Sequence, residues 1–464
     1  MPKLFLLIMI VSFGACKPSV LEPYGATPSA SQLDWHDLNY YMFIHFGPNT
    51  FTNVEWGHGD EDPKVFNPTA LDCRQWAATA KQAGMKGIII TAKHHDGFCL
   101  WPSAYSTHTV RESAWKNGQG DVLRELSDAC REYGLKFGVY LSPWDRNHPQ
   151  YGTPEYNQVF VNMLGEVLGN YGEVFEQWFD GANGEGPNGK RQEYDWVLFN
   201  NTVYKHQPNA IIFSDGGPGC RWVGNERGYA GETNWCTLNA DSVFPGFPNY
   251  EELTPGHEDG THWVPAECDV SIRPGWFYSP DTDDKVKSLE ALMDIYYGSI
   301  GRGGNLLLNI PVDRRGLIHP NDSIRLMEFR EAIDKAFADN LVKNATIKAS
   351  FSKRGYPAEN LLDENNRTYW AADSGNASLE IQFPSPITLN TLLVQEGIEY
   401  GQRVKAFAID VWKDGQYQEV EQQTTIGYKR IIRFETQETD HIRIRILESK
   451  ASPILAGISA YLAD

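Results

Sequence analysis

Asp180 is the residue of this 464-residue chain whose setting most clearly predicts chemistry. It follows the aromatic pair Trp178-Phe179 at the end of an apolar run and precedes a glycine-rich loop. An aspartate at a strand end commonly caps the next turn through backbone N–H groups, which is the structural alternative. A carboxylate that stays ionised beside an indole ring could instead act as a nucleophile and attack an anomeric carbon.

Such a reaction needs a second carboxyl group as proton donor, with a pKa raised by burial or by a neighbouring carboxylate. Three glutamates downstream of Asp180 are candidates: Glu226, Glu232 and Glu267. Glu226 ends the segment Trp222-Val223-Gly224-Asn225-Glu226, a predicted loop. A loop acid suits a leaving group that points out of a pocket, whereas Glu232 and Glu267 fit strand-end positions that bind structural partners or sugar hydroxyls.

Histidines stand at the same kind of position. His45 follows the first apolar run of the repeating pattern, and His94-His95-Asp96 follows the second. Adjacent strand residues point to opposite faces, and neither a His-x-His nor a His-Glu-x-x-His spacing is present, so we predict no metal site. Neutral imidazole both donates and accepts hydrogen bonds, which favours contacts to vicinal sugar hydroxyls. One buried structural histidine in the set is the alternative.

All of these residues follow predicted strands. From about residue 38 to 340, short apolar runs alternate with amphipathic stretches, as in βα units. Eight runs predict a (β/α)8 barrel that is irregular in its fifth to seventh units, with an open doubly wound sheet as the alternative. In a barrel the reacting groups come from the carboxyl ends of the strands. The predicted strands are 40–46, 87–93, 136–142, 174–180, 210–214, a segment near 228–235, 264–272 and 305–310.

Residues 341–464 predict a second domain. Strand-like alternation, a turn at Asp414-Gly415 and almost no helical pattern indicate an all-β sandwich. The predicted strands are 379–383, 389–395, 404–412, 428–434 and 441–446. The chain is therefore divided into a leader (1–16), a catalytic barrel (17–340) and a C-terminal sandwich (341–464).

The leader predicts export. Lys3 precedes a mostly apolar run at 4–15, which is shorter than the roughly 20 residues that span a bilayer. Gly14-Ala15-Cys16 resembles the lipidation site of bacterial lipoproteins, although Phe13 departs from the usual small residue. We expect a periplasmic or cell-surface protein that meets the membrane only through a lipid anchor on Cys16, with ordinary secretion as the alternative. The six other cysteines form no C-x-x-C pair, and we expect mostly buried free thiols.

Composition restricts the ligand. Lys+Arg 41 against Asp+Glu 60 gives a net charge of −19, which argues against nucleic acid and anionic lipid surfaces. With 41% hydrophobic and 22% charged residues the chain is that of a globular protein. The 14 tryptophans favour a neutral amphipathic ligand such as a sugar, while core packing and solubility are the alternative explanation of these numbers.

Five motifs, in this order, are similar to those of glycoside hydrolase family 29, the retaining α-L-fucosidases. The resemblance covers about residues 35–340. It implies an exo-acting enzyme without metal or cofactor that forms a covalent fucosyl-enzyme intermediate. The motifs are Phe43-Ile44-His45-Phe46-Gly47, His94-His95-Asp96-Gly97-Phe98, Trp178-Phe179-Asp180-Gly181, Arg221-Trp222-Val223-Gly224-Asn225-Glu226 and Arg273-Pro274-Gly275-Trp276-Phe277-Tyr278.

The resemblance also implies roles for single residues. Asp180 matches the nucleophile. The acid/base position varies in the family, and Gly224-Asn225-Glu226 resembles the branch that cleaves α-1,3/1,4-fucosyl links, which favours Glu226. Trp56 and Trp276 match positions near the fucose methyl group or the leaving sugar. The positions that match contacts to the fucose ring are His45, Glu55, Trp56, His94, His95, Tyr140 and Trp178.

The C-terminal domain resembles discoidin or galactose-binding-like sandwiches. The resemblance rests on Ala358-Glu359-Asn360-Leu361-Leu362-Asp363, Thr368-Tyr369-Trp370 and Gly401-Gln402-Arg403-Val404. Such domains bind sugar or pack on the barrel and shape its mouth; we favour packing, with Trp370 in the core. The expected substrate is a fucosylated oligosaccharide or glycoconjugate, and no protein partner is predicted. A barrel glycosidase for another sugar and a non-catalytic glycan-binding surface lipoprotein are the alternatives.

Overall fold

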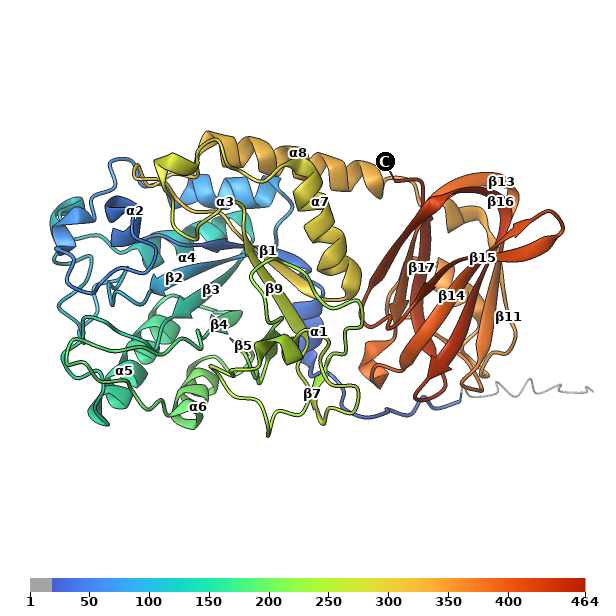
Figure 1. Cartoon of the computed structure of the whole chain (residues 1–464), viewed down its shortest axis with the longest axis horizontal. Coiled ribbons are helices and arrows are strands. Elements are labelled where there is room, and N and C mark those ends of the chain that lie inside the picture. Colours follow the sequence, from blue (N-terminus) through green and yellow to red (C-terminus); the bar gives the residue numbers. More distant parts are fainter. Residues whose placement is uncertain (1–18, 464) are drawn as a thin grey trace, which may run out of the picture.

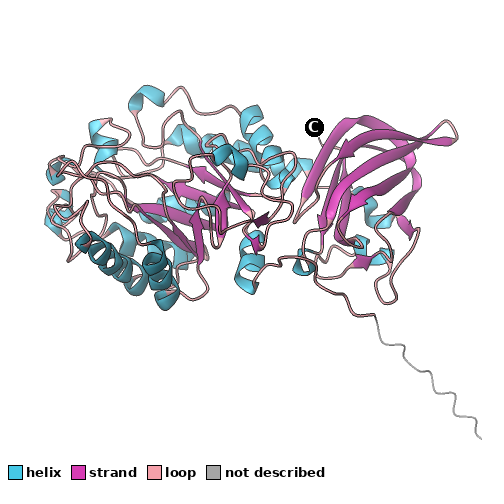
Figure 2. Cartoon of the chain, turned by 60° about the horizontal axis from the view of Figure 1, so that its bottom comes forward, coloured by secondary structure: helices cyan, strands magenta, loops and turns pink. Residues whose placement is uncertain are grey.

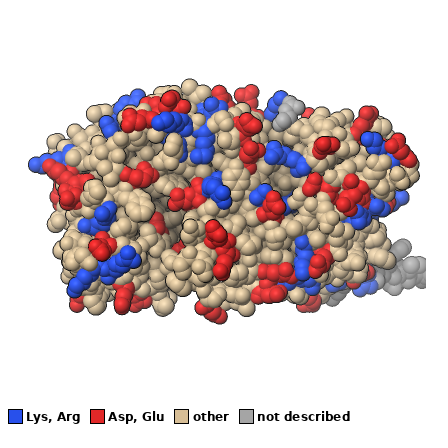
Figure 3. Space-filling view, viewed as in Figure 1, with Lys and Arg blue, Asp and Glu red and all other residues tan. Residues whose placement is uncertain are grey.

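The computed structural model describes residues 19–463, which form an α/β barrel followed by an all-β domain (Figures 1 and 2). The predicted leader and its Cys16 lie outside the described residues. Among residues 19–463, no helix is long and apolar enough to cross a membrane. Acidic and basic side chains are interspersed over the face drawn in Figure 3. All six described cysteines are buried free thiols, as predicted.

Eight parallel strands close into the predicted barrel, so the open doubly wound sheet is excluded. The first and last strands close the ring by pairing residues 40–43 with 306–309. In order around the barrel the strands are β1 (Tyr40–Ile44), β2 (Gly87–Lys93), β3 (Lys136–Leu141), β4 (Glu176–Trp178), β5 (Ile211–Ser214), β6 (Cys220–Trp222), β9 (Ala266–Ser271) and β10 (Asn305–Asn309).

Helices cover the outside of the barrel, and local signals set their ends. The helix α4 starts after Asp121, whose carboxylate accepts a hydrogen bond from the backbone N–H of Arg124. It ends at Gly134, which adopts a left-handed conformation with φ 65°. The helices are α1 (Ala30–His36), α2 (Pro48–Thr52), α3 (Cys73–Gln82), α4 (Val122–Tyr133), α5 (Glu155–Asn170), α6 (Trp196–His206), α7 (Leu289–Gly298) and α8 (Pro320–Ala336).

The sixth strand is not where the sequence predicts it. It is Cys220–Trp222, whereas the segment near 228–235 consists of bends and irregular backbone. With three residues, including Arg221, β6 lacks the apolar run that marks most of the other strands. Arg221 is fully buried because its guanidinium donates to two backbone carbonyls and to Asn234 Oδ1. In place of a helix, the next segment carries β7 (Thr237–Leu238) and β8 (His262–Trp263), which is the predicted irregularity.

The all-β domain is a single seven-stranded sheet that bends around its own core. Its two 20-residue strands each replace two of the short predicted strands, and register shifts after Gln382 and Leu389 mark their bend. Trp370 is fully buried in this core, as predicted. The strands are β11 (Thr346–Ala349), β12 (Trp370–Ala371), β13 (Ala377–Glu396), β14 (Val404–Lys413), β15 (Gln416–Gln423), β16 (Arg430–Ser449) and β17 (Ile454–Tyr461); β11, β12, β15 and β17 are absent from the prediction.

The all-β domain packs on the amino end of the barrel. Gln402 accepts a hydrogen bond from Cys236 N at 2.7 Å and donates to Asn234 O at 2.9 Å. His36, at the end of α1, stacks on Tyr428 with ring centroids 4.9 Å apart. These barrel residues precede β1 and β9, and Figure 1 shows the domain on the side of the barrel away from α2, which follows β1. The prediction that the all-β domain packs on the barrel is therefore confirmed. The prediction that this domain shapes the mouth of the barrel is wrong.

Candidate active site

The side chains predicted to do chemistry gather where the barrel strands end. His45 follows β1, His94 and His95 follow β2, and Asp180 stands two residues beyond β4. Ring contacts connect these segments: the centroids of His94 and His95 are 4.1 Å apart, and those of His45 and Trp276 are 5.0 Å apart. Since parallel strands end on one side of a barrel, segments far apart in sequence meet in one site.

Asp180 is held on two sides and open on another. Tyr140 O–H donates to its Oδ2 at 3.0 Å, and the backbone N–H of Ala182 donates to Oδ1 at 2.8 Å. His95 Nε2 lies 3.7 Å from Oδ2. The side chain keeps a relative exposure of 25%. The carboxylate thus has a set orientation and room for a reacting group.

Two of the histidines are neutral and share one tautomer. Burial lowers the pKa of His45 to about 3 and that of His95 to about 4. His45 Nδ1 faces the side-chain oxygen Oδ1 of Asn309 at 2.8 Å, so this nitrogen carries the proton. His95 Nδ1 faces Ser142 Oγ at 2.8 Å, and that hydroxyl donates to the carbonyl of Trp144, so His95 Nδ1 also carries its proton. Both Nε2 atoms are therefore acceptors.

His94 adds unused hydrogen-bonding capacity. Its ring stacks on Tyr140 with centroids 5.7 Å apart, and burial together with the charges of His95 and His45 lowers its pKa well below 6.5. Its Nδ1 is buried and has no hydrogen-bond partner among the described residues. A buried polar atom without a partner is uncommon in folded proteins, and it marks a position where a ligand group can bind.

Glu55 and Trp276 form the opposite side of the site. Glu55 accepts hydrogen bonds from the backbone N–H groups of Trp276 and Phe277, and burial raises its pKa. This carboxylate therefore positions the loop that carries the Trp276 indole. Trp56, the next residue, is 54% exposed and meets His95 edge-on with centroids 5.8 Å apart. Its indole is available to a ligand at the mouth.

Of the three candidate acids, Glu226 alone shares its environment with Asp180. Trp276 Nε1 lies 3.4 Å from Glu226 Oε2, and the glutamate reaches solvent from the loop after β6. Its pKa is raised by desolvation and by the charges of Asp180 and Glu55. The Glu232 side chain is 84% exposed, and its backbone carbonyl accepts a hydrogen bond from Arg430 of the all-β domain. Its carboxylate lies 3.8 Å from Arg302 Nη2.

Glu267 lies inside the barrel rather than at its mouth. It is fully buried, and its Oε1 accepts a hydrogen bond from Trp178 Nε1 at 2.8 Å. Trp178 in turn stacks on Phe213 with centroids 3.9 Å apart and on Tyr140 with centroids 5.2 Å apart. Glu267 therefore supports the wall of the site from behind.

Four supporting residues were missed by the sequence analysis. Asp215 directly follows β5, accepts a hydrogen bond from Gly246 N at 2.6 Å and has a pKa raised by burial to about 6. Asp215 stands at the carboxyl end of a strand, as Asp180 does, so the expectation that site residues follow barrel strands could have identified it. Ser142 directly follows β3 and Asn309 ends β10, so they share this signal, but only the folded barrel shows that they fix histidines. Asp269 lies within β9 and carries no such signal; it accepts from Trp222 Nε1 at 2.8 Å.

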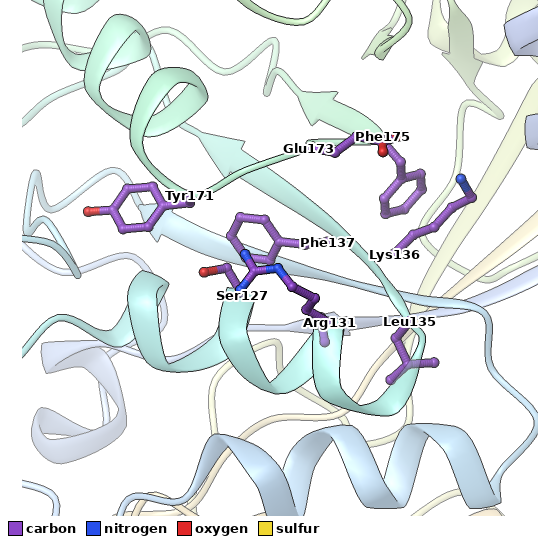
Figure 4. Close-up of a pocket in the computed structure, with 9 residues that line it drawn as sticks. Ser127, Arg131, Leu135, Lys136, Phe137, Tyr171, Glu173 and Phe175 are labelled. Atoms are coloured by element: carbon purple, nitrogen blue, oxygen red, sulfur yellow. The ribbon is translucent and has the colours of Figure 1, made fainter.

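A cavity of about 220 Å³ lies at the other end of the barrel, between α4, the start of β3 and the segment before β4 (Figure 4). Its charged lining residues are Arg131, Lys136 and Glu173. None of the predicted site residues lines it. It is therefore separate from the site at the carboxyl ends of the strands.

A parallel barrel with two carboxyl groups, neutral histidines and indole rings at its carboxyl end is the architecture of a glycoside hydrolase. The chain belongs to the alpha-L-fucosidase family, whose model matches residues 24–334. A model of the F5/8 type C domain matches residues 346–457. The chain is therefore a glycoside hydrolase of the α-L-fucosidase type.

Individual relatives share both domains. Alpha-L-fucosidase 1 of Arabidopsis thaliana is 40% identical over 475 residues, which cover 99% of this chain and 92% of that protein. A crystal structure from Bacteroides thetaiotaomicron superposes with a TM-score of 0.90 at 40% identity, covering 96% of this chain and 99% of its own. A Ruminococcus gnavus GH29 fucosidase in complex with fucose superposes with a TM-score of 0.89 at 30% identity, with 97% of each chain covered.

Proposed function

We propose that this protein is an exo-acting, retaining α-L-fucosidase in which Asp180 is the nucleophile and Glu226 the acid/base. One observation carries the proposal: two carboxyl groups occupy one mouth in different surroundings. Asp180 is oriented by Tyr140 and a backbone N–H with one side open, whereas desolvation and the charge of Asp180 raise the pKa of Glu226. A nucleophile must be ionised and an acid protonated, and this pair of surroundings supports that division.

The reaction proceeds in two displacements. Asp180 attacks C1 of the fucosyl group while Glu226 protonates the glycosidic oxygen, so that the C1–O bond to the leaving sugar breaks as the Asp180–C1 ester bond forms. Glu226, now a carboxylate, then takes a proton from water, whose oxygen attacks C1 and releases Asp180. Two inversions give L-fucose with retained configuration. Carboxyl groups in this role stand about 5–5.5 Å apart.

The neutral histidines support recognition of an uncharged sugar. With Nδ1 protonated, His45 and His95 each offer Nε2 as an acceptor for a sugar hydroxyl, and His94 Nδ1 offers a further position. The indoles of Trp56 and Trp276 offer apolar faces for C–H groups of the sugar or of the leaving group. Since the pKa values of His45 and His95 are about 3 and about 4, these contacts persist at neutral pH.

A mechanism-based label tests the assignment. A 2-deoxy-2-fluoro-fucosyl fluoride should add one fluorofucosyl group to the chain, and peptide mass spectrometry should place it on Asp180. Glu226→Gln should still be labelled because fluoride leaves without an acid, whereas Asp180→Asn should not. A label on another carboxylate would overturn the nucleophile assignment.

We further propose α-1,3/1,4-linked fucose in branched glycans as the substrate class. The support is the loop Gly224-Asn225-Glu226, which carries the acid to the rim of the mouth, where a bulky leaving group must lie. Oligosaccharides that differ only in an α-1,2, α-1,3 or α-1,4 fucosyl bond should be cleaved in the last two cases. Equal cleavage of the α-1,2 isomer would refute this preference, and release of a monosaccharide other than fucose would favour a glycosidase for another sugar.

We also propose that the protein is exported and anchored through Cys16. The support is the apolar run at 4–15 and the Ala15-Cys16 junction. Expression in a bacterial host with a radiolabelled fatty acid should label the wild type, and Cys16→Ser should lose the label. A labelled Cys16→Ser variant would contradict the anchor.

A further inference from the structure

Two glutamates face each other inside the barrel beneath the proposed active site. Glu176 of β4 and Glu267 of β9 are both fully buried. A carboxylate oxygen of each and the sulfur of Cys220 all lie within 4.8 Å of one another. This buried group is outside the set of residues that the mechanism uses.

The hydrogen-bond donors that reach these two carboxyl groups are neutral. Trp35 Nε1 donates to Glu176 Oε2 at 2.9 Å, and the Cys220 thiol reaches Glu176 Oε1 at 4.0 Å. Glu267 receives two donors, Tyr41 O–H on Oε2 and Trp178 N–H on Oε1, the latter at 2.8 Å. These bonds occupy oxygens that a metal ion would otherwise need, and they neutralise no charge.

Two carboxylates this close in such surroundings cannot both be ionised, so the pair retains a proton. The strength of the donors decides where the proton resides. Glu267 accepts from an O–H and an indole N–H, whereas Glu176 accepts from one indole N–H and the weak S–H donor of Cys220. Glu267 is therefore the better-stabilised anion, and Glu176 keeps the proton and points it at Glu267. Burial and the charge of Glu267 raise the pKa of Glu176 well above its ordinary value, in agreement with this division.

Glu267 is linked to Asp180 by two short routes. Trp178 precedes Asp180 by two residues in the chain, so its indole anchors the segment that carries the carboxylate. The same indole stacks on Tyr140, whose O–H donates to Asp180 Oδ2 at 3.0 Å. A displaced indole would disturb both the backbone and the hydroxyl that orient Asp180.

We propose that Glu176 and Glu267 form a proton-sharing pair in which the anionic Glu267 positions Trp178 and, through Tyr140, the attacking oxygen of Asp180. Glu267 is thus a positioning residue rather than an acid/base. This inference rests on the proposed role of Asp180 as nucleophile.

Two isosteric variants provide a matched test. In Glu176→Gln the amide N–H replaces the acid O–H and still donates to anionic Glu267, so kcat should stay within about threefold of wild type. In Glu267→Gln the charge that orients Trp178 N–H is lost and the Tyr41 hydroxyl must reverse its hydrogen bond, so kcat should fall about 30-fold or more while KM changes less than about threefold. A merely structural role would affect the two equally, because both replace a fully buried carboxyl by an amide of the same size.

An infrared measurement tests whether the pair retains a proton. It depends neither on activity nor on the folding of Glu267→Gln. The wild type minus Glu176→Gln difference spectrum, at mildly alkaline pH, should contain a C=O stretch of a protonated carboxylic acid. Where Glu267→Gln folds, it should retain a band of this type. Absence of the band from the wild type minus Glu176→Gln spectrum would overturn the proton sharing.

The outcomes separate this inference from the proposed function. If wild type releases no fucose but the infrared band is present, the proposed function fails while the proton sharing stands. If wild type is active and the two variants lose equal activity, or Glu176→Gln loses more, the positioning role is overturned. The expected result is a large loss confined to Glu267→Gln.

Discussion

The barrel mouth and the all-β domain both bury ionisable side chains, but they differ in how far protein groups fill the hydrogen-bonding capacity of those side chains. In the all-β domain, Glu396 accepts hydrogen bonds from three backbone N–H groups, and Asp410 is held by two arginines. At the mouth, His94 Nδ1 has no partner among the described residues, and Asp180 keeps a quarter of its side chain exposed.

This difference separates groups that hold structure from groups that bind and react. A buried polar group whose hydrogen-bonding capacity is filled by the protein fixes a conformation. A group whose capacity is partly unused can bind a ligand, as at the mouth. Substitutions at the mouth should therefore reduce activity more than stability, and those in the all-β domain should do the reverse.

The largest effect is expected for Asp180→Asn. Loss of the nucleophile should reduce kcat on an aryl α-L-fucoside by at least about 10³-fold, because no covalent intermediate can form. The thermal unfolding midpoint should not fall, since the amide oxygen can still accept from Ala182 N–H while the amide N–H donates to the Tyr140 hydroxyl oxygen. Release of nitrophenol and a thermal melt measure the two quantities. Retention of a tenth of the wild-type rate, or a large drop in the melting temperature, would contradict the expectation that substitutions at the mouth reduce activity more than stability.

Glu226→Gln should reduce turnover of a natural glycan about 10²-fold or more, since its leaving group needs an acid. Because the raised pKa of Glu226 must exceed the ambient pH for it to donate, kcat/KM of the wild type should fall as pH rises through that pKa. His45 and His95 stay neutral far above their pKa values of about 3 and about 4, so they add no alkaline loss. The pH–rate profile of Glu226→Gln should lack the alkaline limb. A limb that persists unchanged would assign it to another group.

Asp410→Asn tests the expectation that substitutions in the all-β domain reduce stability more than activity. Asp410 is 2% exposed and accepts from Arg443 Nε and Arg445 Nε, both at 2.7 Å. Removing its charge should lower the free energy of unfolding by about 2 kcal/mol, less than for a fully buried pair because the arginines are partly exposed. Urea unfolding measures this, and fucose release per folded molecule should equal that of wild type. Lost turnover with unchanged stability would contradict the structural role.

The smallest effect is expected for the substitution of exposed tryptophans, one at the mouth and one in the all-β domain. Trp56 at the mouth is 54% exposed, and Trp412 of the all-β domain is 37% exposed. Trp56→Ala should lower kcat/KM about tenfold through a lost apolar contact with the substrate, and Trp412→Ala should leave it unchanged. Steady-state kinetics on a fucosylated oligosaccharide measure both. A loss in Trp412→Ala would show that the all-β domain binds the substrate.

Much of the barrel could be predicted because most of its strands are apolar runs bounded by turns. Residues 87–93 are buried throughout, and the predicted strand coincides with β2. The sixth strand could not be found this way, since Arg221 lies in β6 and its burial depends on acceptors from three later segments. The two long strands of the all-β domain were predicted as halves, because polar residues occupy their bends.

For the site, the sequence by itself determined which groups stand at the strand ends: Asp180, the histidines and the indoles follow apolar runs, and parallel strands in a barrel end on one side. Only the tertiary structure decided the surroundings of Glu226, Glu232 and Glu267, because their positions depend on how the irregular segments after β5 fold. It also decided the protonation of the histidines, since desolvation sets their pKa values and hydrogen bonds select the tautomer. Spacing along the chain encodes neither the burial nor the hydrogen-bond partners that distinguish the surroundings of these carboxyl groups.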